Sequence, residues 1–410
     1  MDFRFSDKAN QLRAEVRSFL GQTMTPDLRA RLHHTGTFHD SAFLQALVDR
    51  GWLELGWPSP AGPTASAGRT ASAGPSAADP MDSLPLLEEL DRAGAPTDAI
   101  KTTMMIARTV ERVGTEEQKM AVLPGVLAGQ ILFALGFSEP DSGSDVAACK
   151  TSATKDGDIW RINGQKIFTT SAQVCNYVML LTRTNSAVPK HKGLSTFIVP
   201  LDAAGIEIEP LETLSGERTN VTFYNDVTVP ASALLGEVDG GWQVMTVALT
   251  FERGGADAGA LEQLLGQAEA WARTTMDEHG HPRLQDVLVC ERLAQTAIYA
   301  HVSRLLARRC AWLSATGALP GVEGSVAKLV SSEALRHLST EMVDMVGPEG
   351  LRSAYGEVDT TDADGDDRGP IPGFFEQMLR HAQVTTIYGG TSEIQRGIIA
   401  ERGLGLPRAR

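Results

Sequence analysis

Residues 136–145 read GFSEPDSGSD, and this run says more about the fold than any other stretch of the chain. It follows the apolar segment ILFALGFS at 131–138, which is typical of a buried strand. The turn concentrates small residues, hydroxyl groups and backbone N–H donors, which suit a polar ring edge or a phosphate. Taken by itself, the run fits a plain loop between two β elements equally well.

Strand patterns continue outward from this turn and fill residues 131–235. The runs DIWRINGQKIF, YVMLLTRT, LSTFIVPL and VTFYNDVTV are rich in apolar and β-branched residues, and Gly, Pro and Asn turns separate them. These patterns predict a compact β domain over 131–235. The chain shows no nucleotide-binding βαβ pattern.

Helical periodicity lies on both sides of the β domain. Apolar residues three and four apart in DKANQLRAEVRSFL and DSAFLQALVDRGW predict a helical N-terminal domain over 1–130. In GTEEQKMAVLPGVLAGQ, Thr115 is a predicted N-cap, and Pro124 is expected to interrupt the helix. Helical stretches return from GGWQVMTVALTFERGG onward, which predicts a helical C-terminal domain over 236–410. The predicted fold class is therefore α+β.

Two segments depart from these patterns. Residues 58–80 consist almost entirely of Pro, Ala, Gly, Ser and Thr and contain a near repeat of TASAG, which predicts a flexible surface loop. Residues 356–373 are rich in aspartate and at first resemble a calcium loop. Counting from Asp362, however, puts Asp367 where such a loop needs glycine and Gly373 where it needs a bidentate glutamate. We interpret this segment as a solvated acidic loop.

Composition excludes several classes of protein. The 410 residues are 42% apolar, which is ordinary for two or three packed units, and the net charge of −14 argues against nucleic-acid binding. No apolar run approaches the roughly 18 residues of a membrane span, and the N-terminus lacks a signal-peptide core. The four cysteines form no CxxC pair, so we expect no metal site, no disulfide and a cytoplasmic location.

Further motifs follow GFSEPDSGSD in a fixed order. They are GQKIFTTSA at 164–172, LTFERGG at 249–255, MVGPEGL at 345–351 and IYGGTSEIQRGIIAERGLGLPR at 387–408. In order and spacing these motifs resemble the acyl-CoA dehydrogenase family, and the likeness runs from about residue 5 to the C-terminus. The resemblance implies a helical N-terminal domain, a β-barrel-like middle domain and a C-terminal four-helix bundle. It also implies FAD between the β domain and the C-terminal helices.

The resemblance assigns cofactor contacts to two groups of residues. Those expected to hold the flavin ring are Leu135, Gly136, Phe137, Ser138, Gly143, Ser144, Phe168, Thr169 and Thr170. Among them, the ring of Phe168 would stack on the flavin, and the side chain of Thr170 would reach its N5 edge. A core aromatic on a strand is the other interpretation of Phe168. The other expected cofactor contacts are Asp344, Gly347, Thr391 and Glu393, of which Thr391 and Glu393 match positions on the adenine–pyrophosphate half of FAD.

The resemblance also raises the question of the catalytic base. In the best-known members a glutamate directly precedes the Gly-Thr of the last motif, and here that residue is Gly389. In isovaleryl- and long-chain-type members the glutamate lies on the helix after the β domain, immediately before an arginine. Glu252 and Arg253 match that position, so Glu252 is the candidate base. The other interpretation is an exposed acid in the first turn of a helix.

The last motif can keep one role without a carboxylate. The resemblance implies that the backbone N–H of Gly389, with a ribityl hydroxyl of FAD, binds the thioester oxygen as it becomes enolate-like. Substrate contacts are expected from Ser144, Arg253, Tyr388 and Gly390.

Some residues depart from the family pattern. The segment ARTTMDEHGHPR at 272–283 replaces an Arg-x-x-Phe-Gly motif that reaches a neighbouring subunit's FAD. Asp344 stands where glutamine is common, Pro348 where a second glycine is common, and Thr250 where aspartate is often found. The cross-subunit cofactor contact is therefore in question.

The predicted function is FAD-dependent α,β-dehydrogenation of an acyl thioester carried by coenzyme A or an acyl carrier protein. An electron-transfer flavoprotein or another acceptor would reoxidise the flavin. We expect a homodimer or homotetramer, with a hetero-oligomer left open. Two alternatives are a non-catalytic partner subunit of a hetero-oligomer and a flavin oxidase or monooxygenase on the same fold.

Overall fold

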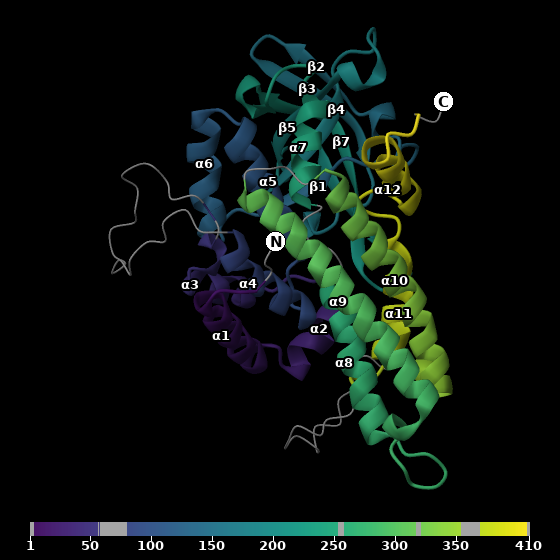
Figure 1. Cartoon of the computed structure of the whole chain (residues 1–410). Coiled ribbons are helices and arrows are strands. Elements are labelled where there is room, and N and C mark those ends of the chain that lie inside the picture. Colours follow the sequence, from purple (N-terminus) through teal and green to yellow (C-terminus); the bar gives the residue numbers. More distant parts are fainter. Residues whose placement is uncertain are drawn as a thin grey trace.

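The computed structural model of the chain describes residues 4–55, 57, 80–252, 258–316, 321–353 and 370–407. Helices come first, strands lie in the middle and helices return (Figure 1), so the predicted α+β class is confirmed. The predicted loop at 58–80 lies outside the described residues except for Pro80. The predicted acidic loop at 356–373 lies outside them except for residues 370–373.

The N-terminal unit is helical, and hydroxyl or carboxyl caps set where several of its helices begin. The predicted N-cap Thr115 is confirmed, since it forms a capping box with Gln118. Pro124 does not interrupt its helix, and this prediction is wrong. Pro124 lies in the last turn of the helix, so its ring disturbs little of it. The hydrogen bond that it cannot make is the one to the carbonyl of Met120, which is an exposed residue. The helices are α1 (Asp7–Thr23), α2 (Pro26–Thr35), α3 (Ser41–Asp49), η1 (Trp52–Glu54), α4 (Pro80–Arg92), α5 (Asp98–Val113) and α6 (Glu116–Leu127).

The middle unit is one mixed sheet in the order β6-β7-β3-β2-β4-β5-β8, with β1 paired parallel to β4 outside this path. Because β6 and β8 remain at opposite ends, the sheet is open, and the expected barrel-like closure is not made. The strands are β1 (Phe133–Gly136), β2 (Ser152–Asp156), β3 (Ile159–Lys166), β4 (Tyr177–Arg183), β5 (Leu194–Pro200), β6 (Ile206–Glu212), β7 (Arg218–Pro230) and β8 (Leu234–Leu235). Short helical turns connect them at η2 (Val146–Ala148), η3 (Ala172–Val174), η4 (Lys190–Lys192) and η5 (Ala231–Ala233).

Strand β4 is buried on both faces, which explains its unbroken apolar sequence. Met179 and Leu181 pack in a core shared with α5, α6 and α7, whereas Val178 and Leu180 pack in a second core formed by the strands. This central strand therefore fixes the helices and the rest of the sheet to each other.

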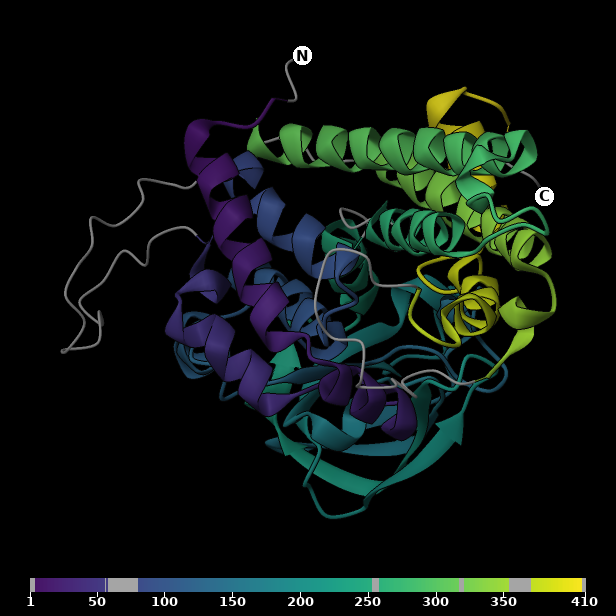
Figure 2. The same ribbon diagram turned by 90° about the horizontal axis from the view of Figure 1, so that it is seen from below.

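The C-terminal unit is a bundle of α8 to α11, with α12 packed against α10. Its apolar core is drawn from these four bundle helices. The elements are α7 (Gly241–Glu252), α8 (Ala258–Thr274), η6 (Arg283–Gln285), α9 (Val287–Ala315), α10 (Val322–Val346), η7 (Gly347–Leu351), α11 (Phe374–Thr385), α12 (Ser392–Ile398) and η8 (Ile399–Gly403). Figure 2 shows α9 along one outer edge of the molecule, with α10 and α8 on its inner side. Of the helices that the structure describes, none has the length and apolar character needed to cross a membrane.

A charged link joins the first and last units. Arg308 of α9 makes two hydrogen bonds to Glu88 of α4, of 2.8 and 3.0 Å, and the two side chains are only 11% and 14% exposed. Arg13 also pairs with Glu88. The paired charges therefore hold α4 against the bundle.

We predict that Arg308→Met lowers the free energy of unfolding by about 2 kcal/mol, as measured by urea denaturation. A buried charge that loses its only partner costs about 3–5 kcal/mol. The loss should be smaller here, because Arg13 still pairs with Glu88. Arg336→Met is the matched control, since it breaks an exposed pair with Glu333 and should cost less than about 1 kcal/mol. Equal losses in both variants would contradict the link.

Candidate active site

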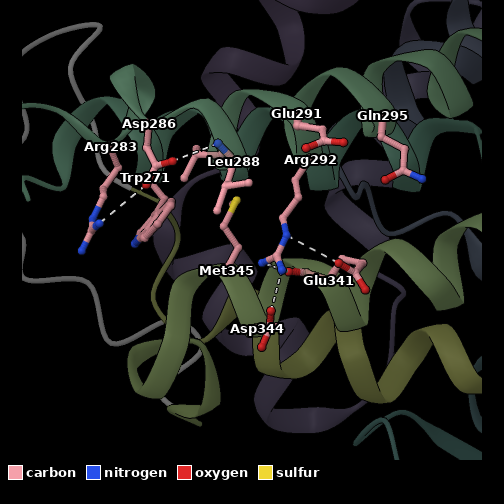
Figure 3. Close-up of a pocket in the computed structure, with 11 residues that line it drawn as sticks. Trp271, Arg283, Asp286, Leu288, Glu291, Arg292, Gln295, Glu341, Asp344 and Met345 are labelled. Atoms are coloured by element: carbon pink, nitrogen blue, oxygen red, sulfur yellow. Dashed lines mark hydrogen bonds and ion pairs between the residues drawn. The ribbon is translucent and has the colours of Figure 1, made fainter.

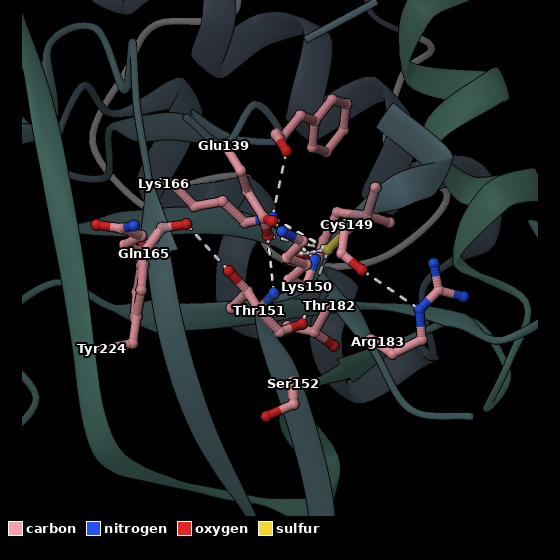
Figure 4. Close-up of polar contacts among 12 residues, drawn as sticks. Glu139, Cys149, Lys150, Thr151, Ser152, Gln165, Lys166, Thr182, Arg183 and Tyr224 are labelled. Carbon is pink, nitrogen blue, oxygen red and sulfur yellow. Dashed lines mark hydrogen bonds and ion pairs between the residues drawn. The ribbon is translucent and has the colours of Figure 1, made fainter. Parts of the chain in front are cut away.

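A buried ion pair joins the turn at 136–145 to the end of β3 (Figure 4). Lys166 is fully buried, and its Nζ donates to Glu139 Oε1 at 2.9 Å and to the carbonyl of Phe137 at 3.2 Å. Glu139 also accepts from the backbone N–H groups of Thr151 at 2.8 Å and Lys150 at 2.7 Å. The charges are thus compensated on both sides, as buried charges require.

The ionisation of this pair follows from its surroundings. Burial alone would raise the pKa of Glu139, but the charge of Lys166 and the hydrogen bonds from Thr151 and Lys150 lower it to about 2. Burial raises the pKa of the neighbouring Cys149 thiol to about 11, so this cysteine is a packed thiol. Because the folded-state pKa of Glu139 is depressed from 4.5, its contribution to stability is present above pH 4.5 and falls away as the pH drops towards 2.

The turn itself leaves its tip open to a ligand. Two backbone hydrogen bonds between Glu139 and Ser142, of 2.9 and 3.0 Å, close the turn, and Gly143 and Ser144 behind it are exposed. The hydroxyl of Ser142 is buried and has no hydrogen-bond partner among the described residues. Phe137 packs into the apolar core, so this residue can offer only its backbone to a cofactor.

Phe168 stands out beside this turn, because its ring is 59% exposed and its backbone is left-handed with φ of 59°. The interpretation of Phe168 as a core strand aromatic is therefore wrong, since β3 ends at Lys166. A left-handed backbone costs a non-glycine residue about 1–2 kcal/mol. Strained residues of this kind cluster at functional sites. An exposed ring held in such a conformation suits stacking against a planar ligand.

Hydrogen bonds on both sides hold Phe168 in place. Before it, the N–H of Ile167 donates to the carbonyl of Ser138 at 3.0 Å. After it, Thr169 exchanges backbone and side-chain hydrogen bonds with Asn220 of β7, at 3.0 and 2.9 Å. Thr169 is fully buried and its hydroxyl bonds to Thr222, so its side chain fixes the loop and cannot itself reach a cofactor.

The double glycine of the last motif forms a tight turn between α11 and α12. Gly389 and Gly390 have φ of 63° and 89°, a region that favours glycine. The buried Gln395 donates to both of their carbonyls, at 2.9 and 3.2 Å, and its own Oε1 lacks a partner among the described residues. The backbone N–H of Gly389 has no hydrogen-bond acceptor among the residues that the structure describes. This N–H is therefore available to a ligand.

The polar residues around this turn have different roles. Thr391 caps α12 by accepting from the N–H of Ile394 at 3.3 Å, which leaves its O–H free to donate elsewhere. Glu393 is 80% exposed and lies 3.8 Å from Arg396. Hydrogen bonding to its own backbone N–H and to Thr391 at the helix start lowers the pKa of Glu393. Glu393 is therefore an ionised surface carboxylate, and Tyr388 beside the turn is 46% exposed.

Glu252 is the twelfth residue of α7, so the expectation that it lies early in a helix is wrong. The helix begins earlier, at Gly241, because Val244, Met245 and Ala248 form an apolar face that packs into the core shared with the sheet. The favourable effect of the helix dipole on an acid is confined to the first turn, which removes the first-turn explanation of Glu252. The side chain of Glu252 and all of Arg253 lie outside the described residues.

Asp344 and Gly347 lie elsewhere, at the end of α10 that points away from the sheet (Figure 1). Asp344 pairs with Arg292 of α9 at 2.6 Å, and both line a cavity of about 460 Å³ (Figure 3). Four carboxylates and two guanidinium groups line this cavity, which leaves it with an excess of negative charge. Within one chain, the structure does not bring these two residues to the flavin turn.

Three residues that the sequence analysis did not single out proved structurally important. Lys166 was detectable as a charged residue inside the strand run INGQKIF, where a buried lysine demands a partner. Asn220 and Gln395 gave no signal, because their partners at Thr169, Gly389 and Gly390 become neighbours only in the fold.

Comparison with known proteins agrees with this architecture. Models of the acyl-CoA dehydrogenase N-terminal, middle and C-terminal domains match residues 6–130, 134–226 and 239–404. Acyl-CoA dehydrogenase FadE26 of Mycobacterium tuberculosis is 33% identical over all of both chains. The solved ChsE4-ChsE5 complex of the same organism contains a chain that is 32% identical over all of both chains with a TM-score of 0.85. A chain of the Tcur3481-Tcur3483 steroid ACAD is 31% identical over all of both chains with a TM-score of 0.83.

The fold and site define an oxidoreductase that acts on CH–CH bonds with a flavin cofactor. The chain belongs to the acyl-CoA dehydrogenase family. Its exposed Phe168, the open tip at Gly143 and Ser144 and the orphaned hydroxyl of Ser142 fit a flavin ring edge.

We predict that Lys166→Met lowers the free energy of unfolding by about 3–5 kcal/mol, because Glu139 becomes a buried carboxylate without its cation. Flavin content should fall with it, since the turn loses its anchor to β3. Denaturant unfolding and the absorbance of the purified protein measure both effects. Lys150→Met is the matched control. Its ion pair with Asp141 is exposed, so its loss should lower the free energy of unfolding by less than about 1 kcal/mol. A stable, fully yellow Lys166→Met protein would contradict this assignment.

We predict that Phe168→Gly and Phe168→Ala both weaken flavin binding by about tenfold, the value of an aromatic stacking contact. The flavin-free proteins should differ, because glycine relieves the left-handed backbone and alanine keeps it. Without flavin, the unfolding temperature of Phe168→Gly should then be higher than that of Phe168→Ala. Phe168→Trp should keep wild-type flavin binding. Unchanged flavin affinity in both small variants would show that the ring does not stack.

Proposed function

We propose that the chain catalyses FAD-dependent α,β-dehydrogenation of an acyl thioester. The observation that carries this proposal is the exposed side chain of Phe168, whose backbone is held in a strained left-handed conformation beside the anchored turn at 136–145. The resulting surface offers one stacking ring and an open backbone tip, with the unpartnered hydroxyl of Ser142 beneath it, and these are groups that a flavin needs. When bound, FAD would accept the hydride that leaves the β-carbon of the acyl group.

The residues of this chain divide the remaining work. The backbone from Leu135 to Ser138, with Gly143 and Ser144, would hold the polar edge of the flavin ring. Phe168 would stack on the ring, and Thr170 would lie at its edge while sharing a hydrogen bond of 3.1 Å with Thr219. Because β3 and β7 fix this surface, the ring would be placed before the substrate arrives.

Two groups would act on the thioester. The free N–H of Gly389 would donate to the thioester oxygen as it gains negative charge. The carboxylate of Glu252 would take the α-proton, and enclosure by the acyl group would favour that uptake. Gly389 carries no side chain that could act as the base, and the family position before the arginine supports Glu252.

The acyl group and its carrier are part of the proposal. The names of the relatives support coenzyme A as the carrier, with an acyl carrier protein as the second choice. The steroid ACAD among the solved relatives makes a steroid-derived acyl-CoA the first substrate to test, against a short linear acyl-CoA. Anaerobic bleaching of the oxidised flavin band by one of these thioesters would establish the reaction.

Electron acceptors and subunits follow from the same comparisons. We propose an electron-transfer flavoprotein or a similar acceptor for the reduced flavin. Two solved relatives are named as pairs of chains, so a second, related chain is an alternative partner in catalysis. A protein that binds flavin and is not bleached by any thioester until a related chain is added would favour the partner-subunit role.

We predict that Glu252→Gln reduces the rate of flavin bleaching by at least about 100-fold, the lower end for a positioned general base. Flavin content and thioester binding should stay close to wild type, because the amide fills the same volume. Rapid mixing under anaerobic conditions measures the bleaching rate. Glu393→Gln is the matched control, since Glu393 is exposed on α12 and its loss should spare the chemical step. If Glu252→Gln bleached the flavin at the wild-type rate, Glu252 would not be the base.

A further inference from the structure

The turn at residues 213–217 joins β6 to β7, and both helical units of the chain contact it. From the N-terminal unit, the carbonyl of Gly36 at the end of α2 accepts from the N–H of Arg218 at 2.7 Å. A side chain at Gly36 would come within 2.5 Å of the carbonyl oxygen of Gly216, so the two backbones pack directly against each other. The N–H of Gly216 also donates to the carbonyl of Thr213 at 3.0 Å, which closes the turn on itself. The turn is therefore held in one place from the N-terminal side.

Helix α11 of the C-terminal unit contacts the same turn through two neighbouring side chains. Nδ1 of His381 lies 2.7 Å from Oε1 of Glu217, and the two side chains are 22% and 27% exposed. Arg380 donates to the carbonyl of Leu214 at 2.6 Å. Burial alone would raise the pKa of Glu217, but the charge and the hydrogen bonding of His381 lower it below its usual value. The group that faces His381 is therefore an ionised carboxylate.

On the Glu217 side, the turn leads directly into the strand that holds the proposed flavin-stacking loop. Glu217 immediately precedes β7. The hydroxyl of Thr219, near the start of this strand, shares a hydrogen bond of 3.1 Å with the hydroxyl of Thr170. The next residue, Asn220, donates to the carbonyl of Thr169 at 2.9 Å. The position of Glu217 is therefore tied to the surface that would carry the flavin.

On the His381 side, α11 leads into the turn that contains Gly389. The N–H groups of Ile387 and Tyr388 both donate to the carbonyl of Val384, at 2.9 and 3.2 Å, so this turn is bonded back onto the end of α11. Val384 comes less than one helical turn after His381. A shift of His381 would therefore carry the free N–H of Gly389 with it. The contact between His381 and Glu217 thus links the thioester turn to the flavin surface.

We propose that His381 is a positioning residue, which acts through Glu217 to set the N–H of Gly389 at the right distance from the flavin surface. This inference rests on the proposed function, in which one acyl group must meet both parts of the site. Its β-carbon has to face the flavin while its thioester oxygen, a few bonds away, meets the N–H of Gly389. A misplacement of about 1 Å can cost about 100-fold in rate. The contact therefore matters more for the reaction than for flavin binding.

Substitution of His381 tests the proposal with two measurements on the flavin-loaded protein. His381→Leu should reduce the rate of flavin bleaching at saturating thioester by at least about tenfold, because the N–H of Gly389 acts mainly in the transition state. The KM for the thioester and the flavin content should stay within about threefold of wild type. Hydrogen exchange of residues 384–392 should become at least about tenfold faster, since this segment loses its anchor. His381→Asn should stay close to wild type in both measurements, because its side-chain N–H can take the place of Nδ1.

Two further variants make the result specific. Glu217→Gln added to His381→Leu should cause no further loss, because both changes break the same contact. His34→Leu is the matched control, since it makes the same substitution at an exposed histidine of α2 and should change neither measurement.

Three outcomes for His381→Leu would overturn the proposal. They are bleaching at the wild-type rate, unchanged exchange of residues 384–392, and faster exchange throughout the C-terminal bundle, which would indicate a general loss of structure. If no thioester bleaches the wild-type flavin, the proposed reaction fails, and the exchange measurement still decides whether His381 fixes the Gly389 turn.

Discussion

The buried pair between Glu139 and Lys166 is the constraint on which the rest of the site depends. Two charges removed from water are costly, and this pair is tolerable only because Lys150, Thr151 and the carbonyl of Phe137 complete its hydrogen bonds. The geometry of these two backbone donors and one carbonyl acceptor leaves one position for the turn relative to β3. A pair of apolar residues could match the stability, but it would not fix the turn with the same directionality. The ion pair thus sets where the exposed ring of the next segment stands.

The sheet and the C-terminal unit supply different kinds of group to the candidate site. The sheet gives a rigid surface made largely of backbone, the turn before α12 gives a free N–H, and α7 carries Glu252, which is proposed as the base. Because Glu252 and Gly389 lie on different elements, separate packing interactions would set the two roles proposed for them. The N-terminal unit makes a structural contribution, since α5 packs on α7 and Glu88 ties α4 to the bundle.

Sequence patterns predicted the features that depend on nearby residues. The order of helices and strands, the cap at Thr115 and the motif turns all follow from spacing within a few residues. The openness of the sheet did not follow, because closure depends on whether β6 and β8 meet. The left-handed backbone of Phe168 and the place of Glu252 late in α7 depend on hydrogen bonds and packing across the fold. The pairing of Arg308 with Glu88 spans 220 residues, which no local pattern reports.

The tether between Thr169 and Asn220 has a consequence for how the protein matures. These residues are 51 positions apart, and they meet only after β3 and β7 have paired. Such distant pairings form slowly, because the intervening chain must be closed first. A flavin therefore cannot template its own platform from a local segment. It would bind only molecules whose sheet is already complete and would stabilise their folded state by mass action, so the yellow colour of a preparation would appear only after the sheet has formed.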